Sequence, residues 1–287
     1  SIKQSTVETI LKSLPEIKVL IVHHPLCCCI KNILEEPKGQ MDVFKLEKIA
    51  LIGYPKWKQE CSQEHQSDHT SCIWSVKTHC PYLKEINFSD FDPQMCALED
   101  LDNIETQKFK FRYDYFEHFY GSSNFQKVIK PFHNIANVVQ SVGESLLDLE
   151  LSGMRLQDGH INSVALWCPN LKTLKLIDVA LKLRDKRMQK FHHVKHLDIN
   201  LKEALTWFVE LADIAWELVD TASALDNNSL VNLIRLVPVV EHMSIEGLNQ
   251  IDDDVFKRIL NVNHLYYLKD LKVLGGEITN ETLKMIL

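Results

Sequence analysis

The amino-acid sequence predicts an α/β solenoid, in which short parallel strands alternate with helices along the chain. One observation behind this prediction is a recurring phrase, in which a proline is followed two positions later by an aliphatic residue and then by apolar residues at alternate positions. A second is that several successive copies start about 21 to 29 residues apart, the period of stacked repeat units. Such repeats decide the fold, because each unit buries its apolar face only against its neighbours.

Ten repeat starts can be placed on one register. In the clearest copies the first, fourth and sixth residues are apolar, and these copies begin at Leu46, Leu146, Leu171 and Leu268. The weakest begin at Thr106 and Ala215, where polar residues fill positions that should be apolar. The full series of predicted starts is Ile17, Leu46, Leu83, Thr106, Leu146, Leu171, Val194, Ala215, Val240 and Leu268.

Each repeat is predicted to contain one short strand. Alternation places Leu174 and Leu176 on the same face of such a strand, pointing into the core. Polar residues at the positions between them then point outward. The predicted strand centres lie near Leu20, Ile49, Ile86, Leu149, Leu174, Leu197, Met243 and Leu271.

The segments that follow the strands are predicted to be helices. Ile161 and Val164 have helical spacing just before Pro169, which ends a helix because its ring cannot continue the hydrogen-bond pattern. Asp and Asn residues at 226–228 and 252–254 precede later apolar runs with the same spacing. Their side chains can cap free N–H groups and suit the positive end of the helix dipole.

Two gaps between repeat starts are longer than the others, at about 37 and 40 residues, and follow the repeats at Leu46 and Thr106. They predict insertions at about 55–72 and 113–133. Apart from these insertions the register is continuous, so residues 1–287 are expected to form a single repeat domain.

Composition excludes several classes of function. A net charge of -7 argues against broad nucleic-acid binding, which needs a basic patch to displace counterions. No run of about 18 apolar residues exists, and the first residues lack the pattern of a signal peptide. The eight cysteines are scattered, which is typical of reduced thiols rather than a secreted disulfide framework. A cytoplasmic or nuclear location is therefore expected, with no membrane partner.

The phrase Cys-Pro-x-Leu occurs at 80–83 and at 168–171, within the spacing L-x-x-L-x-L-x-x-(N/C)-x-L. From about Ile17 to Leu287 the chain resembles the cysteine-containing leucine-rich repeats of F-box/leucine-rich-repeat proteins. The resemblance implies a horseshoe with parallel strands on the concave face and helices on the convex face. It also implies a substrate receptor of a cullin-type ubiquitin ligase. No F-box, the helical segment that docks the ligase adaptor, is visible in this sequence. Whether an F-box lies upstream of Ser1 is left open.

The concave strand face is the predicted partner-binding surface, because solenoids bind along that face. A basic strand beside an acidic one would suit a polar peptide or protein surface of mixed sign. The alternative is that these positions hold charged residues only because strand surfaces must be solvated. The candidate residues are Lys108, Lys110, Arg112, Asp148, Glu150, Lys175, His196 and Asp198.

The two insertions hold further candidates. Aromatic residues are dense from Tyr113 to Phe125 and could be interface anchors or a local core folded back over the solenoid. Four soft ligands in the other insertion could surround a zinc ion, but their spacing matches none of the common zinc modules. These four are Cys61, His65, His69 and Cys72. We predict no metal and no cofactor.

No motif of an enzyme is recognisable. Nucleophile elbows, phosphate loops, dinucleotide-binding glycines and metalloprotease helices are missing, and nine glycines leave little room for loops that cradle phosphate. The sequence therefore predicts a non-catalytic protein-binding module, and the resemblance implies that this module presents a protein substrate to a ubiquitin ligase, through an adaptor and a cullin. The alternative is a stand-alone scaffold or inhibitor with no link to ubiquitination.

Overall fold

The computed structural model describes residues 13–14, 16–23, 45–52, 80, 82–89, 105–112, 130–131, 133–201, 226–248, 251–280, 282 and 284. The chain packs into two compact units. Unit 1 comprises Ser1–Ser123 with His133–Leu146, and unit 2 comprises Asn124–Phe132 with Leu147–Leu287. A single domain over 1–287 stays a prediction. The insertion at 55–72 lies outside the described residues, as does most of the one at 113–133.

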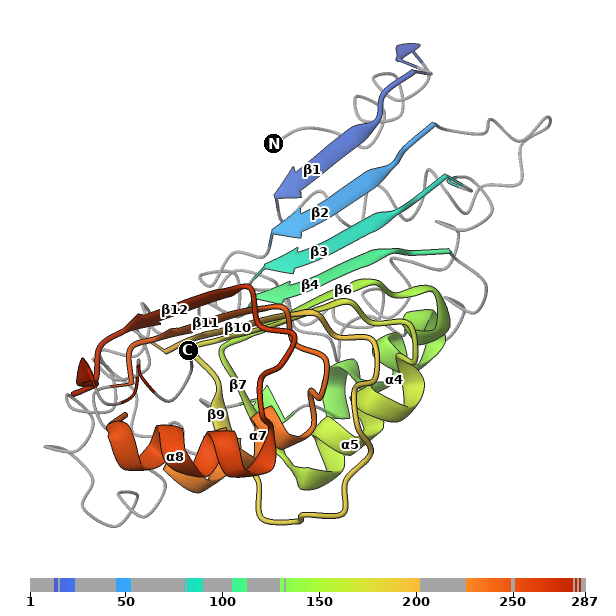
Figure 1. Cartoon of the computed structure of the whole chain (residues 1–287). Helices are drawn as coiled ribbons and strands as arrows, with labels where there is room; N and C mark the ends of the chain where they lie inside the picture. The colour runs from blue at the N-terminus through green and yellow to red at the C-terminus, as the bar shows by residue number, and fades with distance from the viewer. Residues whose placement is uncertain are drawn as a thin grey trace, which may run out of the picture. The chain divides into compact units, whose positions relative to one another are not determined.

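Unit 1 contains parallel strands that follow one another in chain order (Figure 1). Its described strands are β1 (Val19–His23), β2 (Lys48–Ile52), β3 (Glu85–Ser89) and β4 (Lys108–Arg112). They pair without slippage, so that Leu20, Ile49, Ile86 and Phe109 form one row across the sheet. Helix α4 (His133–Val142) and the short helix η7 (Gly143–Ser145) complete the described part of this unit.

Unit 2 repeats the same parallel arrangement. Its described main-sheet strands are β6 (Asp148–Ser152), β8 (Thr173–Ile177), β10 (His196–Asn200), β11 (His242–Glu246) and β12 (Asp270–Leu274), paired in that order. Helices lie together on one side of these strands (Figure 1), and they are α5 (Asp158–Trp167), α7 (Asn227–Arg235) and α8 (Asp253–Val262). The predicted repeat at Ala215 lies outside the described residues, and β10 pairs directly with β11.

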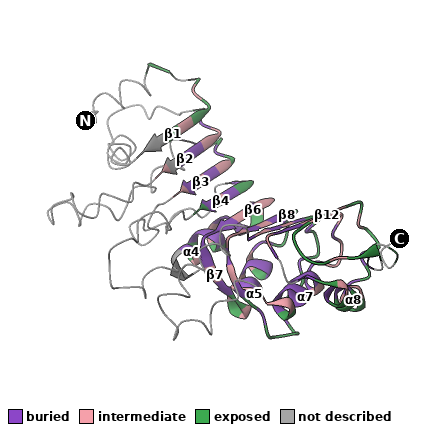
Figure 2. Cartoon of the chain, turned by 90° about the vertical axis from the view of Figure 1, so that its left-hand side faces the viewer, coloured by how far each residue is buried: buried purple, intermediate pink, exposed green. Residues whose placement is uncertain are grey.

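These strands confirm the predicted α/β fold class and its register. Each of the eight predicted centres is the second residue of a strand. In β6, β8, β10 and β11 the second and fourth residues, such as Leu174 and Leu176 of β8, are almost fully buried. Buried residues recur along the strands in Figure 2. The Thr106 repeat also forms its strand, β4, with Phe109 and Phe111 buried. The fold is thus an α/β repeat arrangement whose spacing matches leucine-rich repeats.

A second, smaller sheet was not predicted from the sequence. It consists of β5 (Lys130–Pro131), β7 (Met154–Gln157) and β9 (Ala180–Lys182), all parallel. Strands β7 and β9 closely follow β6 and β8 and carry the last leucines of the repeat phrase, Leu156 and Leu181, into the core. Each of these repeats therefore makes a main strand, a sharp turn and a short second strand before its helix or loop.

The turns after β6, β8 and β11 each contain one residue with positive φ. Gly153 (φ 68°) follows β6, and Gly247 (φ 82°) follows β11. Asp178 (φ 50°) takes the same place after β8, and aspartate tolerates this left-handed region better than most residues. The amide of each of these residues donates a hydrogen bond to the carbonyl at the end of the next strand, for example from Gly153 N to Ile177 O at 3.0 Å. The hydrogen bonding between neighbouring strands therefore continues into the turns.

The helix-start signals read from the sequence are confirmed. The Asp226 carboxylate accepts a hydrogen bond from Ser229 N at 2.6 Å, and the Asp252 carboxylate accepts one from Val255 N at 2.9 Å. Each satisfies an amide that the first helical turn leaves without a partner. The predicted end is also confirmed, because α5 stops at Trp167, two residues before Pro169.

Polar side chains join one repeat to the next. The Asn263 amide donates to the carbonyl oxygens of Ile234 (3.1 Å) and Val237 (2.8 Å), at the end of the preceding helix. The Asp253 carboxylate accepts hydrogen bonds from the Thr279 amide and from the Thr279 and Thr282 hydroxyls. These bonds lower the pKa of Asp253 to about 2. Stacking is therefore fixed by polar contacts as well as by apolar burial.

The register makes a direct prediction about stability. Replacing Leu149 or Leu174 by alanine should lower the free energy of unfolding by about 2 to 5 kcal/mol, because each change leaves a cavity in a packed core. Urea unfolding measures the loss. The matched control is Leu166→Ala on α5, where the side chain is 64% exposed, and it should change the value by less than about 0.5 kcal/mol. Core variants as stable as the control would show that the core positions are misassigned.

Candidate binding surface

The first, third and fifth residues of each main strand share the face opposite the core, because side chains alternate along a strand. We call this the outer strand face of each unit. In unit 2 two of its rows run across five described strands. The first row holds Asp148, Thr173, His196, His242 and Asp270, and the second holds Glu150, Lys175, Asp198, Ser244 and Lys272.

The predicted site residues of unit 2 lie on this face. Glu150, Lys175 and Asp198 are direct neighbours on three adjacent strands, so a lysine stands between two carboxylates. Burial raises the pKa of Asp198, and attraction to Lys175 and a hydrogen bond from Ser244 oppose that rise. Asp148 and His196 share the first row, with Thr173 between them.

The predicted basic residues lie in unit 1. Lys108, Lys110 and Arg112 occupy alternate positions of β4 and therefore share its outer face. Each takes part in interactions within the molecule. The grouping of these three side chains follows from the strand alone, as the sequence predicted. Their role in binding a partner stays a prediction.

A stacked histidine pair stands in the first row of unit 2. The rings of His196 and His242 are parallel to within 1°, with centroids 4.4 Å apart. Nδ1 of His242 lies 2.5 Å from Oδ2 of Asp270, which accepts its hydrogen bond. Partial burial is the main cause that lowers the pKa of His196, and repulsion from His242 adds to it. A proton on His196 is therefore disfavoured.

Ion pairs cross the starts of the strands, a feature that the sequence analysis missed. In unit 2, Glu241 lies 2.6 Å from Lys195 and 2.5 Å from Lys269, each of these residues standing directly before its strand. Hydrogen bonds from the two lysines lower the pKa of Glu241 to about 2. A carboxylate between two ammonium groups from neighbouring repeats holds three strand starts together electrostatically.

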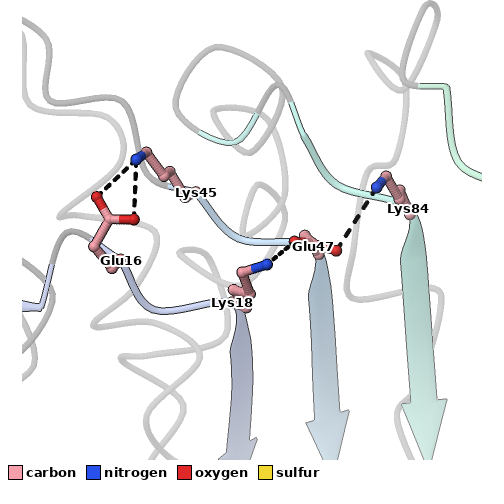
Figure 3. A network of polar contacts seen from close by, with 5 residues as sticks. All are labelled: Glu16, Lys18, Lys45, Glu47 and Lys84. Atoms are coloured by element: carbon pink, nitrogen blue, oxygen red, sulfur yellow. Dashed lines mark hydrogen bonds and ion pairs between the residues drawn. The ribbon is translucent and has the colours of Figure 1, made fainter.

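Unit 1 has the same arrangement (Figure 3). Glu47 lies between Lys18, at 2.8 Å, and Lys84, at 3.7 Å. The hydrogen bond between Lys18 and Glu47 raises the pKa of the lysine and lowers that of the glutamate. A further pair joins Lys45 and Glu16 at 2.7 Å, so polar contacts continue beyond the strand starts. These groups are exposed, and such pairs contribute little stability individually.

Other sequence candidates are not placed by the structure. The set Cys61, His65, His69 and Cys72 lies outside the described residues, as does the aromatic segment from Tyr113 to Phe125. Within the described part of the chain, no group of three or more His, Cys, Asp or Glu side chains is arranged to hold a metal ion. The described helices include none that is long and apolar enough to cross a membrane.

Comparisons with known proteins add little to this geometry. No protein-family profile matches the chain, and no curated protein sequence matches it. Among solved structures, a chain from the crystal structure of the yeast Rad7–Elc1 complex aligns over 98% of this chain and 86% of its own length. The identity is 11% and the TM-score 0.29. At that TM-score the match carries no weight, and the fold assignment rests on the repeat register.

The ion pairs of Glu241 predict a specific acid sensitivity. The folded-state pKa of about 2 lies below the unfolded value of about 4.3, so the stability that Glu241 contributes is complete above the unfolded pKa and lost as pH falls through the folded one. Urea unfolding from about pH 6 to about pH 2 should therefore show the advantage of wild type over Glu241→Gln shrinking toward zero. Glu277→Gln, which removes an exposed carboxylate, is the control. A difference that stays constant over this range would contradict the ion-pair assignment.

Proposed function

We propose that this chain is a non-catalytic protein-binding module and that its outer strand face receives the partner. The observation that carries the proposal is the row Glu150, Lys175 and Asp198 on three strands in register. Neighbouring strands are about 4.8 Å apart, so the row presents alternating charges at a fixed spacing. A rigid array of this kind favours a polar partner in one orientation, since charge pattern controls specificity and association rate more than affinity.

Each unit carries a set of proposed contact residues on its own outer strand face. The set of unit 1 is the basic one of β4, and the set of unit 2 is the mixed one of β6, β8 and β10. Solvation alone would also explain charges at any one of these positions, so the proposal concerns the set. Its members are Lys108, Lys110, Arg112, Asp148, Glu150, Lys175, His196 and Asp198.

We further propose that the module is the substrate-recognition part of a cullin-type ubiquitin ligase. The support is the Cys-Pro-x-Leu phrase, whose cysteines Cys80 and Cys168 are buried at equivalent repeat positions. Burial raises the pKa of both thiols to about 12, so they act as small apolar groups in the core. Adaptor and cullin would bind through an F-box outside this chain, in the cytoplasm or nucleus. The alternative is a stand-alone scaffold or inhibitor.

Charge reversal tests the binding surface. The triple variant Lys108→Glu, Lys110→Glu and Arg112→Glu should slow association with a partner recovered by affinity purification. The loss should grow at low salt, because exposed charges are screened beyond about 8 Å at physiological ionic strength. The control reverses Lys186 and Lys190, exposed residues in the loop between β9 and β10. Association rates equal to wild type for the triple variant and for the pair Lys175→Glu with Asp198→Lys would exclude the outer strand face.

The ligase assignment has a separate test. The full-length protein should co-purify with a cullin and its small adaptor, and the recovered partner should be ubiquitinated in a ligase reconstituted from these components. Partner binding without adaptor or cullin would favour the stand-alone scaffold. Because binding and ubiquitination are scored separately, loss of the second does not affect the first.

A further inference from the structure

The segment 182–190, between β9 and β10, concentrates positive charge on a chain whose net charge is -7. We call this segment the basic loop. Its basic residues are all exposed, and its sequence contains a single acidic residue, Asp185. The basic residues are Lys182, Arg184, Lys186, Arg187 and Lys190. No described residue forms a hydrogen bond or an ion pair with any of these basic side chains, so their charges are available to a partner.

Hydrogen bonds fasten the backbone of the basic loop to α5. The Asp158 carboxylate accepts them from Arg184 N at 2.8 Å and from Asp185 N at 3.1 Å. One turn further along the helix, Asn162 Oδ1 accepts a hydrogen bond from Gln189 N at 2.7 Å. These bonds fix the backbone and leave the basic side chains exposed. A partner therefore binds a loop that is already ordered, which lowers the entropic cost of binding.

The basic loop is also held by α7 and by the core. The amide of Leu183 donates to the Ser229 hydroxyl at 2.8 Å, and the Asn232 side chain donates to Leu183 O at 2.8 Å. The side chains of Leu183 and Met188 are 1% and 8% exposed. In Figure 1 the loop is the yellow trace that runs past α5 and α7. Its apolar residues thus belong to the core, and its exposed residues are charged or polar.

The composition of the basic loop favours an acidic protein segment over other polyanions. Proteins bind single-stranded nucleic acid with aromatic side chains as well as cations, and residues 182–190 include no aromatic residue. Membrane surfaces are bound by cations together with exposed apolar side chains, and the apolar side chains of this loop are buried. Duplex DNA requires a series of phosphate contacts, whereas the loop spans at most about 26 Å at about 3.3 Å per residue, on a chain of net negative charge.

We infer that the basic loop binds an acidic segment of a partner protein, whose carboxylates pair with the lysines and with the paired N–H donors of Arg184 and Arg187. This inference goes beyond the proposed function, because the loop follows a strand of the second sheet and the outer strand face belongs to the main sheet. Reversing the charges of Lys186 and Lys190 separates the two sites. It weakens binding at the basic loop and leaves a partner of the outer strand face unaffected.

The test measures how tightly the whole chain binds a fluorescein-labelled peptide of about ten residues that alternates glutamate with serine, a length that matches the basic loop. Fluorescence anisotropy gives the dissociation constant. The triple variant Lys186→Gln, Arg187→Gln and Lys190→Gln should bind about tenfold more weakly, because the small contributions of three exposed ion pairs are lost together. The variant Lys186→Arg with Lys190→Arg keeps the charges and should bind as wild type does. Affinity should also fall as salt is raised.

The matched control is the triple variant Lys18→Gln, Lys45→Gln and Lys84→Gln, which removes the same total charge from exposed positions of unit 1 and should leave affinity unchanged. Circular dichroism shows whether each variant keeps its fold. In wild type, the peptide should shift the amide resonances of residues 182–190, which tests the inference without any variant.

Three outcomes would overturn the inference while leaving the proposed function intact. They are no binding of the peptide by wild type, equal losses in the two triple variants, and amide shifts centred outside residues 182–190. Tighter loop-dependent binding of a duplex DNA of about 20 base pairs, or of vesicles containing phosphatidylserine, would replace the acidic protein segment by nucleic acid or by a membrane.

Discussion

Burial of the second and fourth residues of each main strand is the interaction on which the rest of this structure depends. Side chains such as Leu149 and Leu174 lie directly opposite one another across paired strands and are almost completely removed from water. A slip of one residue would move a whole strand's apolar set to solvent, so the register is strongly specified. The same register also fixes the positions of the side chains on the outer strand face. Its side chains are aligned in rows because their inward neighbours cannot shift.

Aligned rows bring charged side chains of neighbouring strands close together, and in this sequence positive and negative residues alternate along such rows. Neighbouring strands are so close that like charges in one row would repel, and opposite charges attract. The sets Lys195, Glu241, Lys269 and Lys18, Glu47, Lys84 alternate in sign across neighbouring repeats in both units. In the first row of unit 2, the uncharged Thr173 lies between Asp148 and the stacked pair of His196 and His242, and His242 is hydrogen-bonded to Asp270.

How far the sequence predicts this structure depends on how local the signal is. Strands and helix starts follow from spacing and capping residues within one repeat, so Leu174 and Asp226 could be assigned without coordinates. Thr106 gave a weak signal because a buried threonine fills an apolar position, and among the described residues its hydroxyl has no hydrogen-bond partner. The contact of His196 with His242 was missed, because it requires knowing which repeats are neighbours. The second sheet was not predicted, because its strands are only two to four residues long and show too little alternation to be recognised.

The two kinds of residue on the outer strand face make different contributions to binding. Charges that are already paired, such as Lys48 with Glu85, lose as much hydration on docking as they gain in attraction, so they select orientation and reject wrong partners rather than add affinity. Exposed apolar side chains have no such cost, because covering them releases water from surface that prefers to be buried. On a face built mainly of paired charges, affinity therefore depends on the few apolar positions. In the first and second rows of unit 1, Val19 and Ile21 are the large apolar side chains that the described strands place there.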